Sequence, residues 1–247
     1  MRLLIINPNT TDAMTRKIEA IGRASLPSTT RITAVSGRFG PRYISSRATF
    51  AIAAHAALDA YAEHGRDADG VLLACFGDPG LDALRELSPV PVIGLVEAAA
   101  REAATGGRRF AIVTGGALWE TMLREMLLVR GLSESLVSIR TVAPDGGMIA
   151  RNPDAALQML IEACDACVTA DRAEAVILGG VGLVGLAERI ASMRAYPVIC
   201  SVMAGMRAVA ACGEGNRQGA TPHSPIKVDS IGIAPKLAEI LCGNVAL

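Results

Sequence analysis

Short apolar runs alternate with longer amphipathic segments along almost the whole chain. The short runs are rich in Val, Ile and Leu, as strands buried on both faces are, and the longer segments repeat their apolar positions with a helical period. We predict strands over residues 2–6, 31–35, 71–74, 90–94, 109–113, 137–142, 175–178 and 197–200. We predict helices over residues 11–24, 49–64, 82–87, 97–104, 118–129, 153–169, 186–193, 201–211 and from 235 onward. This alternation predicts an α/β fold built from parallel sheets with right-handed crossovers.

One unit of the chain occurs twice. The stretch VLLACFG at residues 71–77 aligns with VILGGVG at 176–182. Further on, PVIGLVEAAAREA at 91–103 aligns with PVICSVMAGMRAV at 197–209. The repeat predicts two pseudo-symmetric lobes, each a parallel sheet flanked by helices, with strand ends that face each other.

The lobe boundaries follow from this repeat. The chain would enter the second lobe near residues 95–98 and leave it near 201–205. We therefore assign residues 1–97 and 206–247 to the first lobe and residues 98–205 to the second. Ligands of open parallel sheets bind beyond the carboxyl ends of the strands, so we expect the active site in the cleft between the lobes.

Composition narrows the classes of function. Of the 247 residues, 51% are hydrophobic and 19% are charged, and the formal net charge is zero. The chain can build a large core but lacks the basic excess of a nucleic-acid-binding protein. No apolar run is long enough to cross a membrane, and the start is too short for a signal-peptide core. We expect no nucleic-acid or membrane partner and a cytoplasmic location, where the six cysteines stay reduced.

Motifs for metals and nucleotides are not evident. Cys164 and Cys167 form a CxxC pair, but they lie inside the helix predicted over 153–169 with no second pair or histidine cluster. Buried helix cysteines are a better interpretation than a zinc site, so we expect no metal. The spacing of the three histidines predicts no catalytic triad, and no dinucleotide-binding or phosphate-binding glycine loop is present.

Cys75 is the strongest candidate for chemistry. It ends a predicted buried strand, and Asp78 and Pro79 suit the cap and first position of the next helix. Backbone N–H groups of Phe76 and Gly77 would converge near the sulfur, lower the pKa of the thiol and stabilise enolate charge. A thiolate in that setting can remove a proton beside a carbonyl. The alternative is a buried structural cysteine.

A series of motifs resembles those of the hydantoin and allantoin racemases, within the aspartate/glutamate racemase superfamily. In chain order they are INPNTT (6–11), GPRYI (40–44), ACFGDPGL (74–81), IVTGGALW (112–119), LGGVGLVGL (178–186), PVICSV (197–202) and NRQGATPHSPIK (216–227). The resemblance covers nearly the whole chain to about Lys227, and ACFGDPGL is its most specific part. It implies two pseudo-symmetric lobes, no metal or organic cofactor, a small-molecule substrate such as a hydantoin, allantoin or carboxylate, and a homo-oligomer.

In that family two cysteines face each other across the substrate's stereocentre, and one removes the proton while the other delivers one. The first matches Cys75, but the position of the second is Gly180, which carries no acid or base. Three explanations stay open. The first is that the glycine is an engineered or unusual substitution in an impaired racemase. The second is that another group supplies the second proton, with Cys200 as the candidate, although a role in the core is the alternative for that cysteine. The third is a reaction that needs protonation on only one face of the carbon, such as decarboxylation of a malonate-type acid.

Further residues are expected to bind the substrate. Asn7 matches the family's substrate-side asparagine, although Asn-Pro-Asn is also ordinary turn chemistry. Thr114 and Gly115 follow a strand, where they could cradle an anion or cap a helix, and Tyr43 and Ile44 lie on a loop that the family folds over its substrate. The expected substrate-binding residues are Asn7, Ile44, Phe76, Gly77, Thr114, Gly115, Val181 and Gly182.

These observations predict an isomerase. The enzyme would be a cofactor-independent racemase whose thiolate abstracts a proton alpha to a carbonyl in a hydantoin, an allantoin or another amino-acid derivative. The alternatives are a single-cysteine decarboxylase or lyase of malonate-type acids, and a ligand-binding homologue with impaired catalysis.

Overall fold

The computed structural model describes residues 1–142, 152–215 and 228–243, so the last of the motifs, at 216–227, lies outside the described residues. The predicted α/β fold is confirmed. Two four-stranded parallel sheets have the orders β2-β1-β3-β4 and β6-β5-β7-β8. The strands are β1 (Arg2–Asn7), β2 (Arg31–Ser36), β3 (Gly70–Leu73), β4 (Val92–Gly94), β5 (Phe110–Gly115), β6 (Leu136–Val142), β7 (Ala175–Gly179) and β8 (Val198–Cys200).

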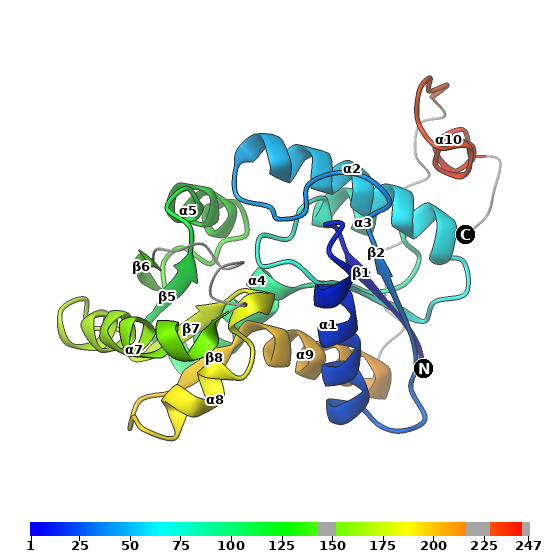
Figure 1. The fold of residues 1–247 in the computed structure, drawn as a ribbon. Coiled ribbons are helices and arrows are strands. Elements are labelled where there is room, and N and C mark those ends of the chain that lie inside the picture. Colours follow the sequence, from blue (N-terminus) through cyan, green and yellow to red (C-terminus); the bar gives the residue numbers. More distant parts are fainter. Residues whose placement is uncertain (143–151, 216–227, 244–247) are drawn as a thin grey trace.

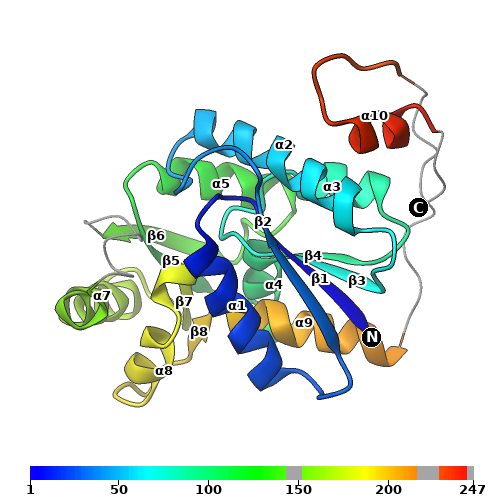
Figure 2. The same ribbon diagram turned by 45° about the vertical axis from the view of Figure 1, so that its right-hand side comes forward.

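Helices connect the strands and cover the sheets. They are α1 (Asp12–Ser25), α2 (Arg47–His64), α3 (Leu81–Leu87), α4 (Leu95–Ala103), α5 (Trp119–Val129), α7 (Pro153–Thr169), α8 (Leu186–Ala191), α9 (Ser201–Gly215) and α10 (Pro235–Leu241). Two short 3₁₀ helices, η1 (Thr105–Gly107) and η2 (Val181–Leu183), were not predicted. Figures 1 and 2 show α4 and α9 between the two sheets, and both helices contact strands of each sheet.

The two sheets share one topology. The second strand along each sheet, β1 or β5, pairs with a neighbour on both sides, and the fourth strand, β4 or β8, is at an edge. In register, Leu73 lies beside Gly94 and Leu178 beside Cys200. The division of the chain at residues 97/98 and 205/206 stays a prediction, and both points fall inside helices, α4 and α9.

The core is aliphatic and runs through the middle of both sheets. Every residue of β3, β5 and β7 is buried, which explains why these strands read as continuous apolar runs. Alanines fill the buried face of α2, where Ala53, Ala56, Ala57 and Ala60 are almost fully inaccessible to solvent. Such small side chains let a helix pack close to a sheet in a protein with few aromatic residues.

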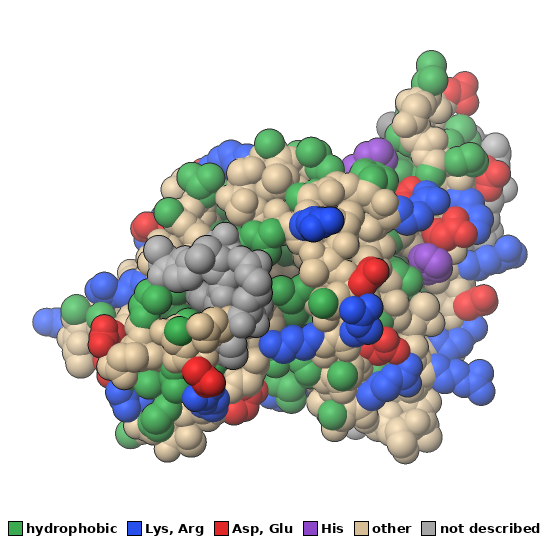
Figure 3. Space-filling view, viewed as in Figure 1, with side chains coloured by type: hydrophobic (Ala, Val, Ile, Leu, Met, Phe, Trp, Pro, Cys, Tyr) green, Lys and Arg blue, Asp and Glu red, His purple; other side chains and the backbone are tan. Residues whose placement is uncertain are grey.

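The described surface has mixed charge. Figure 3 shows acidic and basic side chains interspersed over one face of the molecule, in keeping with a formal net charge of zero. Among the helices in the described part of the chain, none has the length and apolar character needed to cross a membrane.

Candidate active site

A cavity of about 50 Å³ lies at the carboxyl ends of strands from both sheets, as the sequence predicts for a cleft between two lobes. Cys75 reaches it from the loop after β3, and Gly180 reaches it directly after β7. The volume has room for a few water molecules. The described residues around it are Asn9, Met14, Tyr43, Ile44, Ala74, Cys75, Phe76, Thr114, Trp119, Gly179, Gly180, Val181, Gly182 and Leu183.

Most of the predicted site residues meet at this cavity. The predicted residues that line it are Cys75, Gly180, Ile44, Phe76, Thr114, Val181 and Gly182. The predicted residues that do not line it are Asn7, Gly77, Gly115 and Cys200. Sequence reasoning assigned no site role to Asn9, Met14, Ala74, Trp119, Gly179 or Leu183, which also line it.

Cys75 is almost buried, with 8% of its surface exposed. Its carbonyl oxygen accepts hydrogen bonds from the backbone N–H groups of Gly77 at 2.9 Å and Asp78 at 3.1 Å. The Gly77 N–H is therefore used inside the turn. Burial raises the pKa of the Cys75 thiol, and the nearby Asp78 carboxylate raises it further. The prediction of a lowered pKa is wrong because loss of solvent and a like charge both oppose ionisation.

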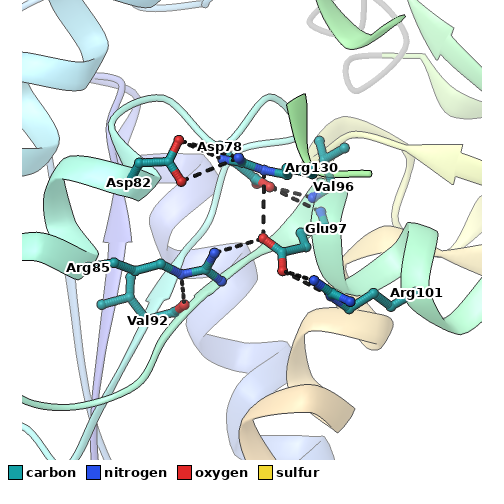
Figure 4. Close-up of polar contacts among 8 residues, drawn as sticks. All are labelled: Asp78, Asp82, Arg85, Val92, Val96, Glu97, Arg101 and Arg130. Carbon is teal, nitrogen blue, oxygen red and sulfur yellow. Dashed lines mark hydrogen bonds and ion pairs between the residues drawn. The ribbon is translucent and has the colours of Figure 1, made fainter. Parts of the chain in front are cut away.

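Asp78 caps a different helix from the one predicted. Helix α3 begins at Leu81 after Gly80, which has φ +82°, and no side chain caps it. The Asp78 carboxylate instead accepts hydrogen bonds from the backbone N–H groups of Val96 and Glu97 in α4, both at 3.1 Å. Burial raises the pKa of this carboxyl to about 7. The loop that carries Cys75 is thus fastened to the first turn of α4 (Figure 4).

A network of ion pairs surrounds that attachment. Glu97 pairs with Arg85 and Arg101, each at 2.8 Å, and with Arg130 at 3.6 Å. Arg130 follows α5 and also reaches Asp82, at 3.3 Å, in α3 (Figure 4). Because α5 follows a strand of the second sheet and α3 follows a strand of the first, Arg130 links the two halves of the molecule beside the Cys75 loop.

Gly179 and Gly180 lack side chains for different reasons. A Cβ atom on Gly179 would collide with the ring of Phe76, which packs there from the other sheet's loop. Gly180 faces open space, with Leu183 Cγ the nearest atom at 3.9 Å from a Cβ built on it. Its backbone has φ +127° and ψ 141°, a conformation that glycine adopts at much lower cost than other residues. Position 180 therefore has room for a side chain but resists one through its backbone.

Cys200 is turned toward helix α9. Burial raises the pKa of its thiol, and the backbone N–H groups of Met203 and Val202 at the start of α9 partly offset that rise. It does not belong to the described lining of the cavity. This placement favours a core role over the hypothesis that Cys200 supplies the second proton.

Asn7 supports the loop that presents Asn9. The Asn7 side chain is fully buried, and its Nδ2 donates to Asn9 Oδ1 at 3.0 Å and to Thr15 Oγ1 at 2.9 Å. Asn9 lines the cavity from the same turn. The signal for Asn9 was present in the Asn-Pro-Asn motif, but the sequence does not say which amide faces the cleft.

The second sheet contributes Thr114 and Trp119. Thr114 Oγ1 donates to the carbonyl oxygen of Gly179 at 2.8 Å and so ties the ends of β5 and β7 together. Trp119 lies so close to Gly77 that a Cβ on that glycine would overlap its ring. Gly77 thus shapes the cavity wall without lining it.

The predicted burial of the CxxC pair is confirmed. Cys164 and Cys167 are both fully buried in α7. In residues 1–142, 152–215 and 228–243, no group of three or more His, Cys, Asp or Glu side chains is arranged to hold a metal ion.

Comparisons with known proteins agree with this architecture. The family model described as Asp/Glu/Hydantoin racemase matches residues 3–209. Hydantoin racemase from Pseudomonas sp. (strain NS671) is 33% identical over 208 residues, which is 84% of both chains. Hydantoin racemase from Paenarthrobacter aurescens is 34% identical over 211 residues, or 84% of this chain and 89% of that protein. The structure of allantoin racemase from Klebsiella pneumoniae has a TM-score of 0.80 and 33% identity, covering 85% of this chain and 86% of that one.

Proposed function

The chain belongs to the Asp/Glu/hydantoin racemase family and is an isomerase of the racemase type, and on that premise we propose that it interconverts the enantiomers of a 5-substituted hydantoin. The observation that carries the proposal is Cys75 in the wall of a cavity whose described lining contains no Lys, Arg, His, Asp or Glu. A neutral ring suits such a lining. A substrate carboxylate would enter without a cationic partner, which is costly in a buried site.

The chemistry is proton transfer at C5 of the ring. The C5–H bond lies beside a carbonyl, so removal of the proton gives an enolate that can be protonated again on either face. Burial raises the pKa of Cys75, so the neutral thiol is the resting form and is ready to donate a proton. Its ionised form removes one in the other direction.

Backbone groups would stabilise the enolate. Within the described part of the chain, no acceptor takes a hydrogen bond from the backbone N–H of Phe76, Val181 or Gly182, and all three residues line the cavity. Fixed N–H donors near a developing oxyanion act strongly where water is excluded. They come from the loops after β3 and β7, so they could reach the ring from both sheets.

A panel of substrates tests the proposal against its alternatives. We would incubate each enantiomer of 5-benzylhydantoin with the protein and follow optical rotation against a blank without protein. Both enantiomers are expected to lose rotation faster than the blank. Release of CO₂ from phenylmalonate without racemisation of the hydantoin would instead establish the decarboxylase alternative. Binding of the hydantoin without turnover, reported by fluorescence of Trp119, the one tryptophan of the sequence, would establish the impaired homologue.

The cellular location, the cofactor requirement and the oligomeric state of the enzyme are also proposals. We infer an enzyme that needs no cofactor, because a thiol and backbone donors suffice for proton transfer beside a carbonyl. We also infer a cytoplasmic location, where the six free cysteines would stay reduced. We further infer a homo-oligomer. Its support is the exposure of Leu118, Leu128 and Val129 in and next to α5, at 60%, 66% and 80%. Light scattering after gel filtration tests the oligomer, and a monomer at micromolar concentration would contradict it.

A further inference from the structure

Resting on the function proposed above, we propose that Asp78 is a positioning residue that acts through Cys75, because it holds the turn that carries the thiol and places a carboxyl group near it. Asp78 does not belong to the described lining of the cavity. It would therefore act on a substrate only through the neighbouring residues of its turn.

Asp78 closes the turn that presents Cys75. Its backbone N–H donates to the carbonyl oxygen of Cys75 at 3.1 Å, and its own carbonyl oxygen accepts from the N–H of Leu81 at 3.2 Å, at the start of α3. The φ of Asp78 is +46°, in the left-handed region, which is costly for a residue with a side chain. Such a conformation persists only where the surrounding contacts hold it, and residues of this kind cluster at functional sites.

The Asp78 side chain occupies a fitted position between β4 and α4. Only 2% of the residue is exposed, and its carboxylate accepts hydrogen bonds from the N–H groups of Val96 and Glu97, both at 3.1 Å (Figure 4). A Cβ on Gly94, the last residue of β4, would overlap the carboxylate, so the glycine leaves room for it. Displacement of this carboxylate would therefore release the turn that carries Cys75.

The two halves of the molecule differ at this position as they differ at the thiol. In the repeat that aligns residues 71–77 with 176–182, the next two residues are Asp78 and Leu183. The half with Cys75 has the carboxyl group, and the half with Gly180 has an aliphatic side chain that lines the cavity. This pairing of acid and thiol favours a role toward Cys75 over a purely structural attachment of α4.

The Asp78 carboxyl group changes its charge near neutral pH. Burial raises its pKa to about 7; the N–H groups of α4 and the Arg130 guanidinium oppose this rise, and Glu97 adds to it. Burial raises the pKa of the Cys75 thiol, and ionised Asp78 raises it further. Asp78 thus favours the protonated thiol most strongly above pH 7. The other charged side chains along the groove that Asp78 lines are Arg47, Asp82 and Glu125.

Alkylation of Cys75 tests the effect of this charge. The protein would be treated with iodoacetamide at pH 6 and at pH 8.5, and modification of the peptide that contains Cys75 would be followed by mass spectrometry. Asp78→Asn is uncharged at both pH values, whereas the wild-type carboxyl group is ionised mainly at pH 8.5. The alkylation rate of the variant divided by that of the wild type should therefore rise at least about threefold from pH 6 to pH 8.5.

The ratio separates charge from exposure, because a turn that is merely loosened would raise alkylation by the same factor at both pH values. Asp82→Asn is the matched control, since that carboxylate also pairs with Arg130 but is 72% exposed. Its ratio to the wild type should be the same at both pH values. The same constancy in Asp78→Asn would overturn this inference and leave the proposed function standing.

Racemisation by Asp78→Gly tests the positioning. Glycine adopts a positive φ readily, but it has no carboxylate to accept the N–H groups of α4. With 5-benzylhydantoin we expect kcat to fall at least about 10-fold and KM to stay within about threefold of the wild type, because Cys75 loses its fixed place. An unchanged kcat would overturn this inference as well. A wild type that racemises neither enantiomer would overturn the proposed function, while the alkylation ratios would still decide whether Asp78 acts on Cys75.

Discussion

The carboxylate of Asp78 and the sulfur of Cys200 have equivalent places in the two halves of the molecule. Asp78 accepts hydrogen bonds from two backbone N–H groups in the first turn of α4, and the corresponding N–H groups of α9 act on the Cys200 sulfur and lower the pKa of its thiol against the effect of burial. Gly94 aligns with Cys200 in the repeat, and a Cβ on Gly94 would overlap the Asp78 carboxylate. In one half the first turn of the helix therefore meets a side chain from the loop after the third strand, and in the other half it meets a side chain at the end of the last strand.

A capping role for Cys200 predicts that Cys200→Ser retains racemisation. The serine hydroxyl can accept hydrogen bonds from the same N–H groups. We therefore expect a racemisation rate within about threefold of the wild type and a free energy of unfolding within about 1 kcal/mol of the wild-type value. Cys200→Val cannot accept them and should lose about 1–3 kcal/mol of stability. Urea unfolding and polarimetry measure both. A folded Cys200→Ser protein with a rate reduced 100-fold, about the contribution of a general acid, would restore Cys200 as the second acid.

The buried carboxyl of Asp78 predicts a pH-dependent stability. Burial raises its pKa to about 7, above the value of an unfolded aspartate, so the protonated form is favoured in the fold. Its contribution to the free energy of unfolding is largest at acid pH and is lost as the pH rises toward 7. Relative to Asp78→Asn, which does not titrate, the wild type should lose at least about 1 kcal/mol between pH 5 and pH 8.

Urea unfolding of both proteins at the two pH values measures this effect. Asp82→Asn is the control, because that side chain lies in the next helix and is 72% exposed. It should follow the pH dependence of the wild type. If the free energies of unfolding of the wild type and Asp78→Asn change by the same amount between the two pH values, the buried carboxyl does not titrate in this range.

Gly180→Cys should combine a gain in rate with a cost in stability. The backbone conformation at Gly180 disfavours any side chain, so we expect the free energy of unfolding to fall by about 1–3 kcal/mol. There is open space for the thiol, and racemisation should rise if the position is that of the family's second cysteine. Gly180→Ala is the matched control for backbone strain. Equal rates in the Cys and Ala variants would refute the assignment of position 180.

The fold could be predicted because each of its signals is local. Continuous apolar runs such as 71–74 and 175–178 are buried strands, and the helices between them require parallel crossovers. Cys75 and Gly180 follow equivalent strands of the two sheets, and the internal repeat predicts that these strand ends face each other, so their meeting at one cavity also followed from the sequence. The two 3₁₀ helices were missed because such single turns have little periodicity to detect.

The electrostatics of the site could not be predicted in the same way. The pKa of Cys75 depends on how completely the fold buries its sulfur and on where the Asp78 carboxylate turns. The choice of Asn9 over Asn7 depends on a side-chain hydrogen bond to Thr15, in the following helix. These are tertiary contacts, and residue spacing along the chain does not encode their direction.

Substitution of Cys75 tests the proposed function most directly. In Cys75→Ser the hydroxyl keeps nearly the size of the thiol but does not ionise in the range where the enzyme works. We would compare it with the wild type by polarimetry on both enantiomers of 5-benzylhydantoin and by deuterium uptake at C5. The account predicts that racemisation of both enantiomers falls at least about 100-fold while Trp119 fluorescence still reports binding. Racemisation by Cys75→Ser at the wild-type rate would contradict it.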